Sequence, residues 1–199
     1  MNTTEQVPDV STPLIPGQPP KPAIDIALWG ASVLGKIAQP VSRDEDVRGV
    51  IEHMHHVMNK WDGAGIAAPQ IGVSKAIFLW RNPETGEVKA CINPRITQQE
   101  GSQKDHEGCL SIPGVSGPIV RSQILVLEFE DENRQMQTIV AKDYLARVFQ
   151  HEVDHLWGMT IAERVGAVHK GLWKNRLKTV KEWAQKTVVK PVRTSHDAE

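Results

Sequence analysis

The segment "QHEVDHLWG", residues 150–158, places two histidines four residues apart, with a glutamate directly after the first. On an α-helix, residues i and i+4 share a face, so His151 and His155 would present both imidazoles to one metal ion. Glu152 would then stand beside the ion as a carboxylate that is not a ligand. The plainer alternative is an amphipathic helix with surface histidines. Because so short a pattern also arises by chance, a third ligand must be found.

The residues around this segment predict a largely buried helix over 142–157. Asp143 suits its first turn, and Gly158 suits its C-terminal stop. The neighbours of the motif are bulky and apolar, namely Val148, Phe149, Leu156 and Trp157. Because an unpaired polar group is costly to bury, histidines on such a helix need a partner, which favours the metal interpretation.

The segment "EGCLSIPG", residues 107–114, offers the third ligand. Cys109 lies between a glycine and a leucine, shortly before a Pro-Gly turn. A lone cysteine is most often a small buried side chain, and that alternative stays open for Cys109 taken by itself. Two histidines and one cysteine, however, make a tetrahedral site whose fourth position is open for water, which is the arrangement of a catalytic metal.

The loop "GAGIAAPQ", residues 63–70, is a third candidate element. Its glycines permit close approach of a backbone, and the Gln70 side-chain amide could donate to a developing oxyanion. The alternative is a solvent-facing glutamine in a helix-to-strand loop. A phosphate-binding loop is excluded, because the lysine of that motif is missing.

A metalloprotease of the His-Glu-x-x-His type is the first rival hypothesis. It would need a further histidine six residues after His155, or a glutamate on a following helix. Position 161 is Ile, Glu163 lies too close, and Glu182 falls in a basic helix. The sequence therefore does not favour a protease.

Taken together, three motifs identify a family resemblance. The order G-x-G-x-A-A-x-Q, E-G-C-L-S and Q-H-E-x-D-H resembles the signature motifs of peptide deformylases, over roughly residues 24–185. These enzymes remove the formyl group from the N-terminal formylmethionine of new bacterial and organellar proteins. A second rival is a deformylase-like protein that binds formyl peptides without turnover, although the intact Glu152 argues against it.

The resemblance implies a role for each motif residue. The implied metal ligands are Cys109, His151 and His155, and the implied general base and acid is Glu152. The implied oxyanion donors are Gln70 and the backbone N–H of Leu110.

Substrate contacts are implied in the same way. Gly65 is expected to hydrogen-bond the peptide backbone, and Val148 and Tyr144, about one and two turns before His151, are expected in the methionine pocket. Gly35, where many relatives carry Arg, and the turn at 114–121 depart from the family pattern, which puts peptide preference in question.

The resemblance also implies the cofactor, one Fe(II) per chain, which Zn, Ni or Co can replace. Ligand softness and affinity by themselves would favour zinc at a Cys-His-His site. A second metal at "HMHH", residues 53–56, is a weaker interpretation than exposed helix histidines.

The expected fold is α+β, with small antiparallel or mixed β-sheets packed around the central motif helix, an N-terminal helix and a C-terminal helix. The N-terminal helix should follow a capping box at 42–45, and the C-terminal helix should span 168–185. The loop at 63–72 should be irregular. Strands are expected at 76–80, 88–92, 124–130 and 135–140, the last two forming an antiparallel hairpin.

We expect one catalytic domain, residues 24–185, between a Pro-rich disordered tail at 1–23 and a flexible tail at 186–199. Two cysteines in 199 residues are typical of a reducing compartment, and we find no secretory signal or apolar span, so a soluble cytoplasmic protein is expected. We also expect a monomer.

A net charge of −1 predicts no general affinity for nucleic acid or anionic membranes. The basic C-terminal helix is either a solvated face or a ribosome contact. The substrates that the resemblance implies are N-formylmethionyl nascent peptides.

Overall fold

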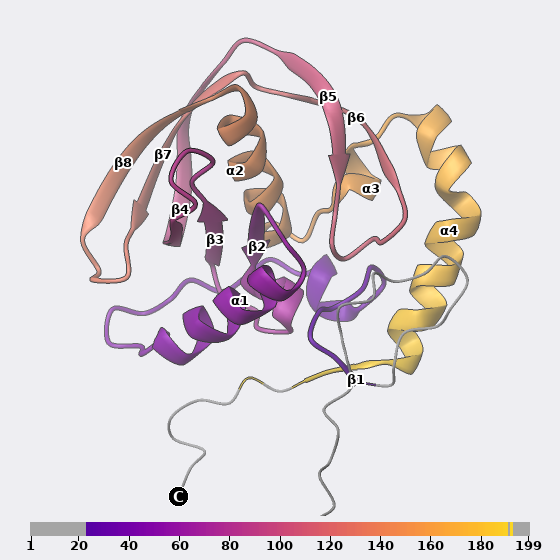
Figure 1. The fold of residues 1–199 in the computed structure, drawn as a ribbon, viewed down its shortest axis with the longest axis horizontal. Coiled ribbons are helices and arrows are strands. Elements are labelled where there is room, and N and C mark those ends of the chain that lie inside the picture. Colours follow the sequence, from indigo (N-terminus) through magenta and orange to yellow (C-terminus); the bar gives the residue numbers. More distant parts are fainter. Residues whose placement is uncertain (1–22, 191, 193–199) are drawn as a thin grey trace, which may run out of the picture.

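The computed structural model describes residues 23–190 and 192. Its centre is an antiparallel sheet in the order β2-β3-β4-β7-β8 (Figure 1). The strands of this sheet are β2 (Gly65–Ala67), β3 (Ile77–Arg81), β4 (Val88–Glu100), β7 (Ile124–Glu130) and β8 (Met136–Lys142). All four strand pairs within it are antiparallel.

Helix α2 (Asp143–Leu156) packs against one face of this sheet, and α1 (Arg48–Lys60) packs against the other. Successive side chains of a strand point to opposite faces, so the buried side chains of β3 pack alternately toward α2 and toward α1. Phe78 and Trp80 pack with Phe149 of α2, with ring centroids 5.7 and 5.1 Å away. Ile77 and Leu79 face the core under α1. The motif helix is therefore buried against the sheet.

A hairpin of β5 (Gln103–Gly108) and β6 (Ser116–Arg121) covers the other side of α2 (Figure 1). Short α3 (Ile161–Arg164) and long α4 (Ala167–Lys186) pack beside this hairpin. The remaining short elements are β1 (Ala23–Ile24), η1 (Ser32–Gly35), η2 (Ala68–Ile71) and β9 (Val188–Val189), with β1 and β9 paired in parallel. Cys109 thus lies in the loop that links β5 to β6.

The α+β prediction, with the motif on a central helix, is confirmed, as is the hairpin of β7 and β8. Three local expectations were wrong. The expected capping box instead forms a turn, in which the Ser42 N–H donates to Glu45 Oε2 at 3.3 Å, and α1 begins only at Arg48. The loop expected to be irregular contains β2 and η2, and no strand was expected where β5 and β6 form.

The expected disordered tail at 1–23 lies, except for residue 23, outside the described residues. Within the expected flexible tail from residue 186, Val188 and Val189 form β9, which pairs with β1. Among the helices that the structure describes, none is long and apolar enough to cross a membrane.

Candidate metal site

Helix α2 turns the two motif histidines to the same side. The rings of His151 and His155 lie 5.1 Å apart between centroids, at an interplanar angle of 70°. The hairpin loop brings Cys109 to them, with its Sγ 3.3 Å from His155 Nε2. One donor atom from each of these three residues lies within 4.8 Å of the others, and this is the one such His, Cys or carboxylate group of three or more found among the described residues.

The donor set fits a metal ion. One thiolate and two imidazoles are the ligands of catalytic zinc and related ions, and three protein ligands leave a coordination position open. Burial is the main cause that holds the pKa of His155 well below its usual range, so its imidazole is neutral and suited to bind a metal. For His151, burial opposes protonation, but hydrogen bonds with Cys109 and Glu107 outweigh it and raise the pKa.

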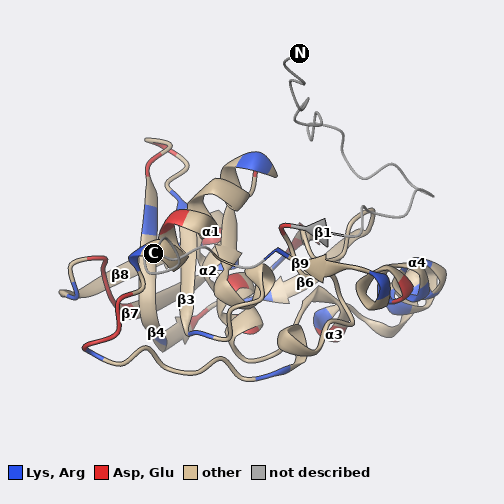
Figure 2. Cartoon of the chain, turned by 90° about the horizontal axis from the view of Figure 1, so that it is seen from below, with Lys and Arg blue, Asp and Glu red and all other residues tan. Residues whose placement is uncertain are grey.

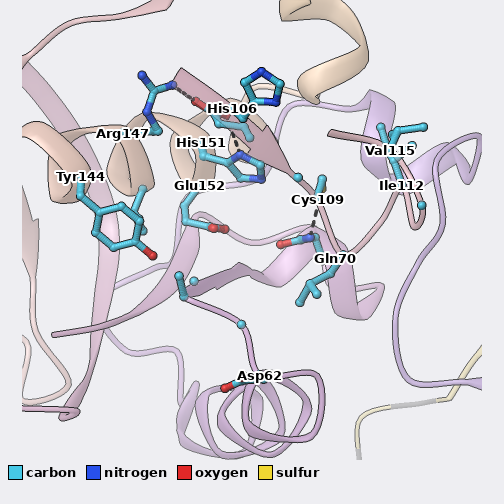
Figure 3. Close-up of a pocket in the computed structure, with 18 residues that line it drawn as sticks. Asp62, Gln70, His106, Cys109, Ile112, Val115, Tyr144, Arg147, His151 and Glu152 are labelled. Atoms are coloured by element: carbon cyan, nitrogen blue, oxygen red, sulfur yellow. Dashed lines mark hydrogen bonds and ion pairs between the residues drawn. The ribbon is translucent and has the colours of Figure 1, made fainter. Parts of the chain in front are cut away.

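Gln70 is held rigidly beside the cysteine. Its Oε1 accepts a hydrogen bond from the Ala67 N–H at 2.9 Å, and its Nε2 donates to Ser111 Oγ at 3.1 Å. The same nitrogen lies 3.8 Å from Cys109 Sγ (Figure 3). Only 2% of Gln70 is exposed, so the interpretation of a solvent-facing glutamine was wrong. An amide fixed in this way is a preorganised donor.

Glu152 is a buried carboxylate whose hydrogen bonding is incomplete. The residue is 4% exposed, and its Oε2 has no hydrogen-bond partner within the described part of the chain. Burial raises its pKa to about 7, against the opposing charge of His151. Gly65 permits this placement, because a Cβ there would lie 2.6 Å from Glu152 Oε1. A buried carboxylate oxygen without a protein partner calls for a ligand, and a pKa near 7 suits a group that takes and returns protons.

A charge network lies behind His151. Its Nδ1 lies 3.0 Å from Glu107 Oε2, and Arg121 binds the same carboxylate through two hydrogen bonds of 2.9 Å. Arg147 adds a third bond from a guanidinium, at 2.7 Å. Burial would raise the pKa of Glu107, but the bonds from Arg121 and His151 outweigh it and lower the pKa far below the usual range. Glu107 therefore stays ionised and orients the His151 ring.

The sequence analysis assigns no role to the residues of this network, although two of its carboxylates lie inside the signature motifs. Glu107 begins the E-G-C-L-S motif, and Asp154 lies inside Q-H-E-x-D-H, yet neither was given a role. Asp154 pairs with Arg121 and with Arg164. Acidic residues inside motifs that are otherwise buried should have raised the question of their partners. Arg121 and Arg164 lie outside every motif and gave no such signal.

A pocket with a volume of about 430 Å³ opens over this centre (Figure 3). In the view, Tyr144 marks one end, Ile112 and Val115 mark the other, and Glu152 lies between them. His155 is completely buried. The other predicted site residues all line the pocket, namely Gly65, Gln70, Cys109, Leu110, Tyr144, Val148, His151 and Glu152. Val148 is 8% exposed and Tyr144 55%, so the tyrosine stands at the rim.

The fold and this site define a class, the metal-dependent hydrolases with one Cys-His-His centre. Comparison with known proteins gives the family. The chain belongs to the polypeptide deformylase family, whose profile matches residues 23–170.

Individual relatives agree. The chain is 39% identical to a peptide deformylase of Carboxydothermus hydrogenoformans over 145 residues, which cover 71% of this chain and 93% of the relative. It is 34% identical to the crystal structure of peptide deformylase from Thermus thermophilus, with a TM-score of 0.73 and coverage of 81% and 98%. A class I type b peptide deformylase from Acinetobacter baumannii, crystallised with Met-Ala-Ser bound, is 30% identical, with a TM-score of 0.66 and coverage of 72% and 98%.

Proposed function

We propose that this protein hydrolyses the formyl group from the N-terminal formylmethionine of newly synthesised proteins, giving formate and a peptide that begins with methionine. Family membership supports the reaction class. The observation that carries the proposal is the pocket, where a three-ligand donor set, a buried carboxylate with one unpartnered oxygen and a fixed amide donor converge.

The metal would be held by Cys109, His151 and His155. A metal bound there would polarise the formyl oxygen and lower the pKa of water from 15.7 toward about 7. We propose Fe(II) as the native ion, with Zn, Ni or Co able to replace it. Metal analysis of anaerobically purified protein tests the choice, and one zinc per chain with full activity would contradict it.

Glu152 would move the proton. In this proposal its carboxylate accepts a proton from the attacking water and returns one to the departing methionyl amine. The pKa of about 7 matches both steps near neutral pH. Gln70 Nε2 and the backbone N–H of Leu110 would donate to the oxygen on which negative charge develops.

The peptide would lie along the pocket. We propose that the Gly65 backbone hydrogen-bonds the peptide, and that Val148 and the ring of Tyr144 contact the methionine side chain. The Acinetobacter baumannii relative was crystallised with Met-Ala-Ser bound, a peptide of the kind that the reaction would release.

Outside the pocket, five exposed lysines support a surface contact of α4 with the ribosome (Figure 2). They are Lys170, Lys174, Lys178, Lys181 and Lys186. We further propose a cytoplasmic monomer that has no direct nucleic-acid function and whose catalytic domain spans residues 24–185.

The test is formate release from formyl-Met-Ala-Ser by the iron-loaded protein under anaerobic conditions. We expect one formate per peptide and no cleavage between the amino acids. Cleavage of internal peptide bonds without formate would support the protease alternative instead. Binding of the formyl peptide without turnover would support the binding protein.

A further inference from the structure

Helix α4 packs directly against the loop that forms one wall of the pocket. Two glycines of the hairpin make this approach possible. A Cβ on Gly117 would lie 2.7 Å from the ring of Trp173, and a Cβ on Gly114 would lie 2.8 Å from Arg176 Nη2. Gly114 also has a φ of +82°, a conformation that other residues adopt only with strain.

Arg176 holds this loop by its backbone. Its Nε donates to the carbonyl oxygen of Pro113 at 2.7 Å, and its guanidinium stacks over Trp183, 4.8 Å from the ring centroid. In the described part of the chain, the buried Nη2 of Arg176 has no hydrogen-bond partner. The contacts that place the guanidinium are therefore the Pro113 carbonyl of the loop and the ring of Trp183.

The loop held in this way is part of the site. It begins with Cys109 and Leu110, and its residues Ile112, Gly114 and Val115 line the pocket. The Ile112 N–H donates to the Cys109 carbonyl at 2.9 Å, so the turn closes back on the cysteine. A shift at Pro113 would consequently move the pocket wall.

We propose that Arg176 is a positioning residue for the part of the substrate that follows the methionine. The inference rests on the proposed function, in which the methionine side chain lies at the Tyr144 end of the pocket. In this proposal the formyl group lies at the centre of the pocket, and the residues after the methionine run along the wall that Ile112, Gly114 and Val115 contribute to the lining, at the end opposite Tyr144 (Figure 3). In this proposal Arg176 fixes that wall through the Pro113 carbonyl and takes no part in metal binding or in the reaction at the formyl group.

The test compares two substrates that differ only beyond the methionine, formyl-Met-Ala-Ser and formyl-methionine amide. For Arg176→Ala we expect KM for the tripeptide to rise about tenfold, since small misplacements of a binding wall weaken binding contacts, while kcat and KM for the amide stay within about twofold. Arg176→Lys, which keeps the charge and a donor, should recover part of the loss. Asn175→Ala, an exposed neighbour on α4, is the matched control and should change neither constant.

Two outcomes would overturn the proposal. One is an unchanged KM for the tripeptide in Arg176→Ala. The other is an equal change for both substrates, because that pattern indicates general loss of structure, which thermal melting would register independently. If Arg176→Ala does not fold, KM for the tripeptide is compared with KM for the amide in Arg176→Lys instead, and the same outcomes decide. If wild type releases no formate from either substrate, the proposed function has failed. That result differs from a variant in which the two KM values keep their wild-type ratio.

Discussion

Two buried carboxylates line the same pocket, and their surroundings act on them in opposite ways. Glu107 accepts hydrogen bonds from Arg121 and Arg147 and contacts His151, and its pKa lies far below the usual range, although burial acts against this. Glu152 keeps one oxygen without a partner in the described chain, and burial raises its pKa to about 7. The comparison separates a carboxylate that holds the site together from one that is left able to exchange a proton.

The largest effect among the residues around these carboxylates is expected at Gln70. If Gln70 donates to the developing oxyanion as proposed, Gln70→Ala should lower kcat on the order of 100- to 1,000-fold. Metal content should stay at the wild-type level, because Gln70 is not in the donor set. Steady-state formate release measures the effect, with exposed Gln137→Ala as the control. A loss smaller than about tenfold would remove Gln70 from the oxyanion role.

Because Glu107 orients His151, a substitution of Glu107 should change metal affinity, unlike the substitution of Gln70. Glu107→Gln keeps the shape but removes the charge that orients His151, so metal affinity should fall about 10- to 100-fold. Competition with a chelator measures this affinity. Glu128→Gln, at a pair with exposed Arg95, is the control and should leave it unchanged. If metal affinity is unchanged in Glu107→Gln while formate release collapses, the two carboxylates have been assigned the wrong way round.

Asp25 extends the comparison to a paired carboxylate that does not line the pocket. It is 6% exposed and pairs with Lys60 and Lys190; burial would raise its pKa, but these bonds lower it. Its contribution to stability is therefore present above its ordinary pKa of 3.8 and is lost as the pH falls through the lower pKa of the folded state. Asp25→Asn should cost about 1–3 kcal/mol of unfolding free energy at pH 7 without changing kcat.

Denaturant unfolding across pH measures this effect, and the gap between Asp25→Asn and wild type should narrow below pH 3.8. Glu87→Gln, at an exposed pair with Lys89, should stay within about 0.5 kcal/mol of wild type. A gap that is constant down to acid pH would refute the assignment to Asp25.

Much of this fold could be predicted because its signals are local. The alternation in β7, from Ile124 to Glu130, and the apolar face of α2 are set by residues close in sequence. The hairpin of β5 and β6 was missed because β5, "QKDHEG", is mostly polar and pairs with one other strand. Such a strand lacks the apolar alternation on which a sequence prediction depends.

The residues that line the site could be predicted as well, whereas the residues that support them could not. The motifs name the residues that line the pocket, since ligands and donors must be of particular chemical types. The supports of those residues are not restricted in this way. Arg121 bonds Glu107, which lies 14 residues away in the sequence, and Arg176 bonds Pro113, which lies 63 residues away. Only the folded chain brings these partners together.

We propose that Glu152 moves the proton while the charges around it hold the metal site. Formate release by Glu152→Gln, measured together with bound metal, tests these two roles. We predict metal content equal to wild type and a rate lower by on the order of 100- to 10,000-fold. A variant that binds its metal normally and still releases formate within about tenfold of the wild-type rate would show that Glu152 does not carry the proton.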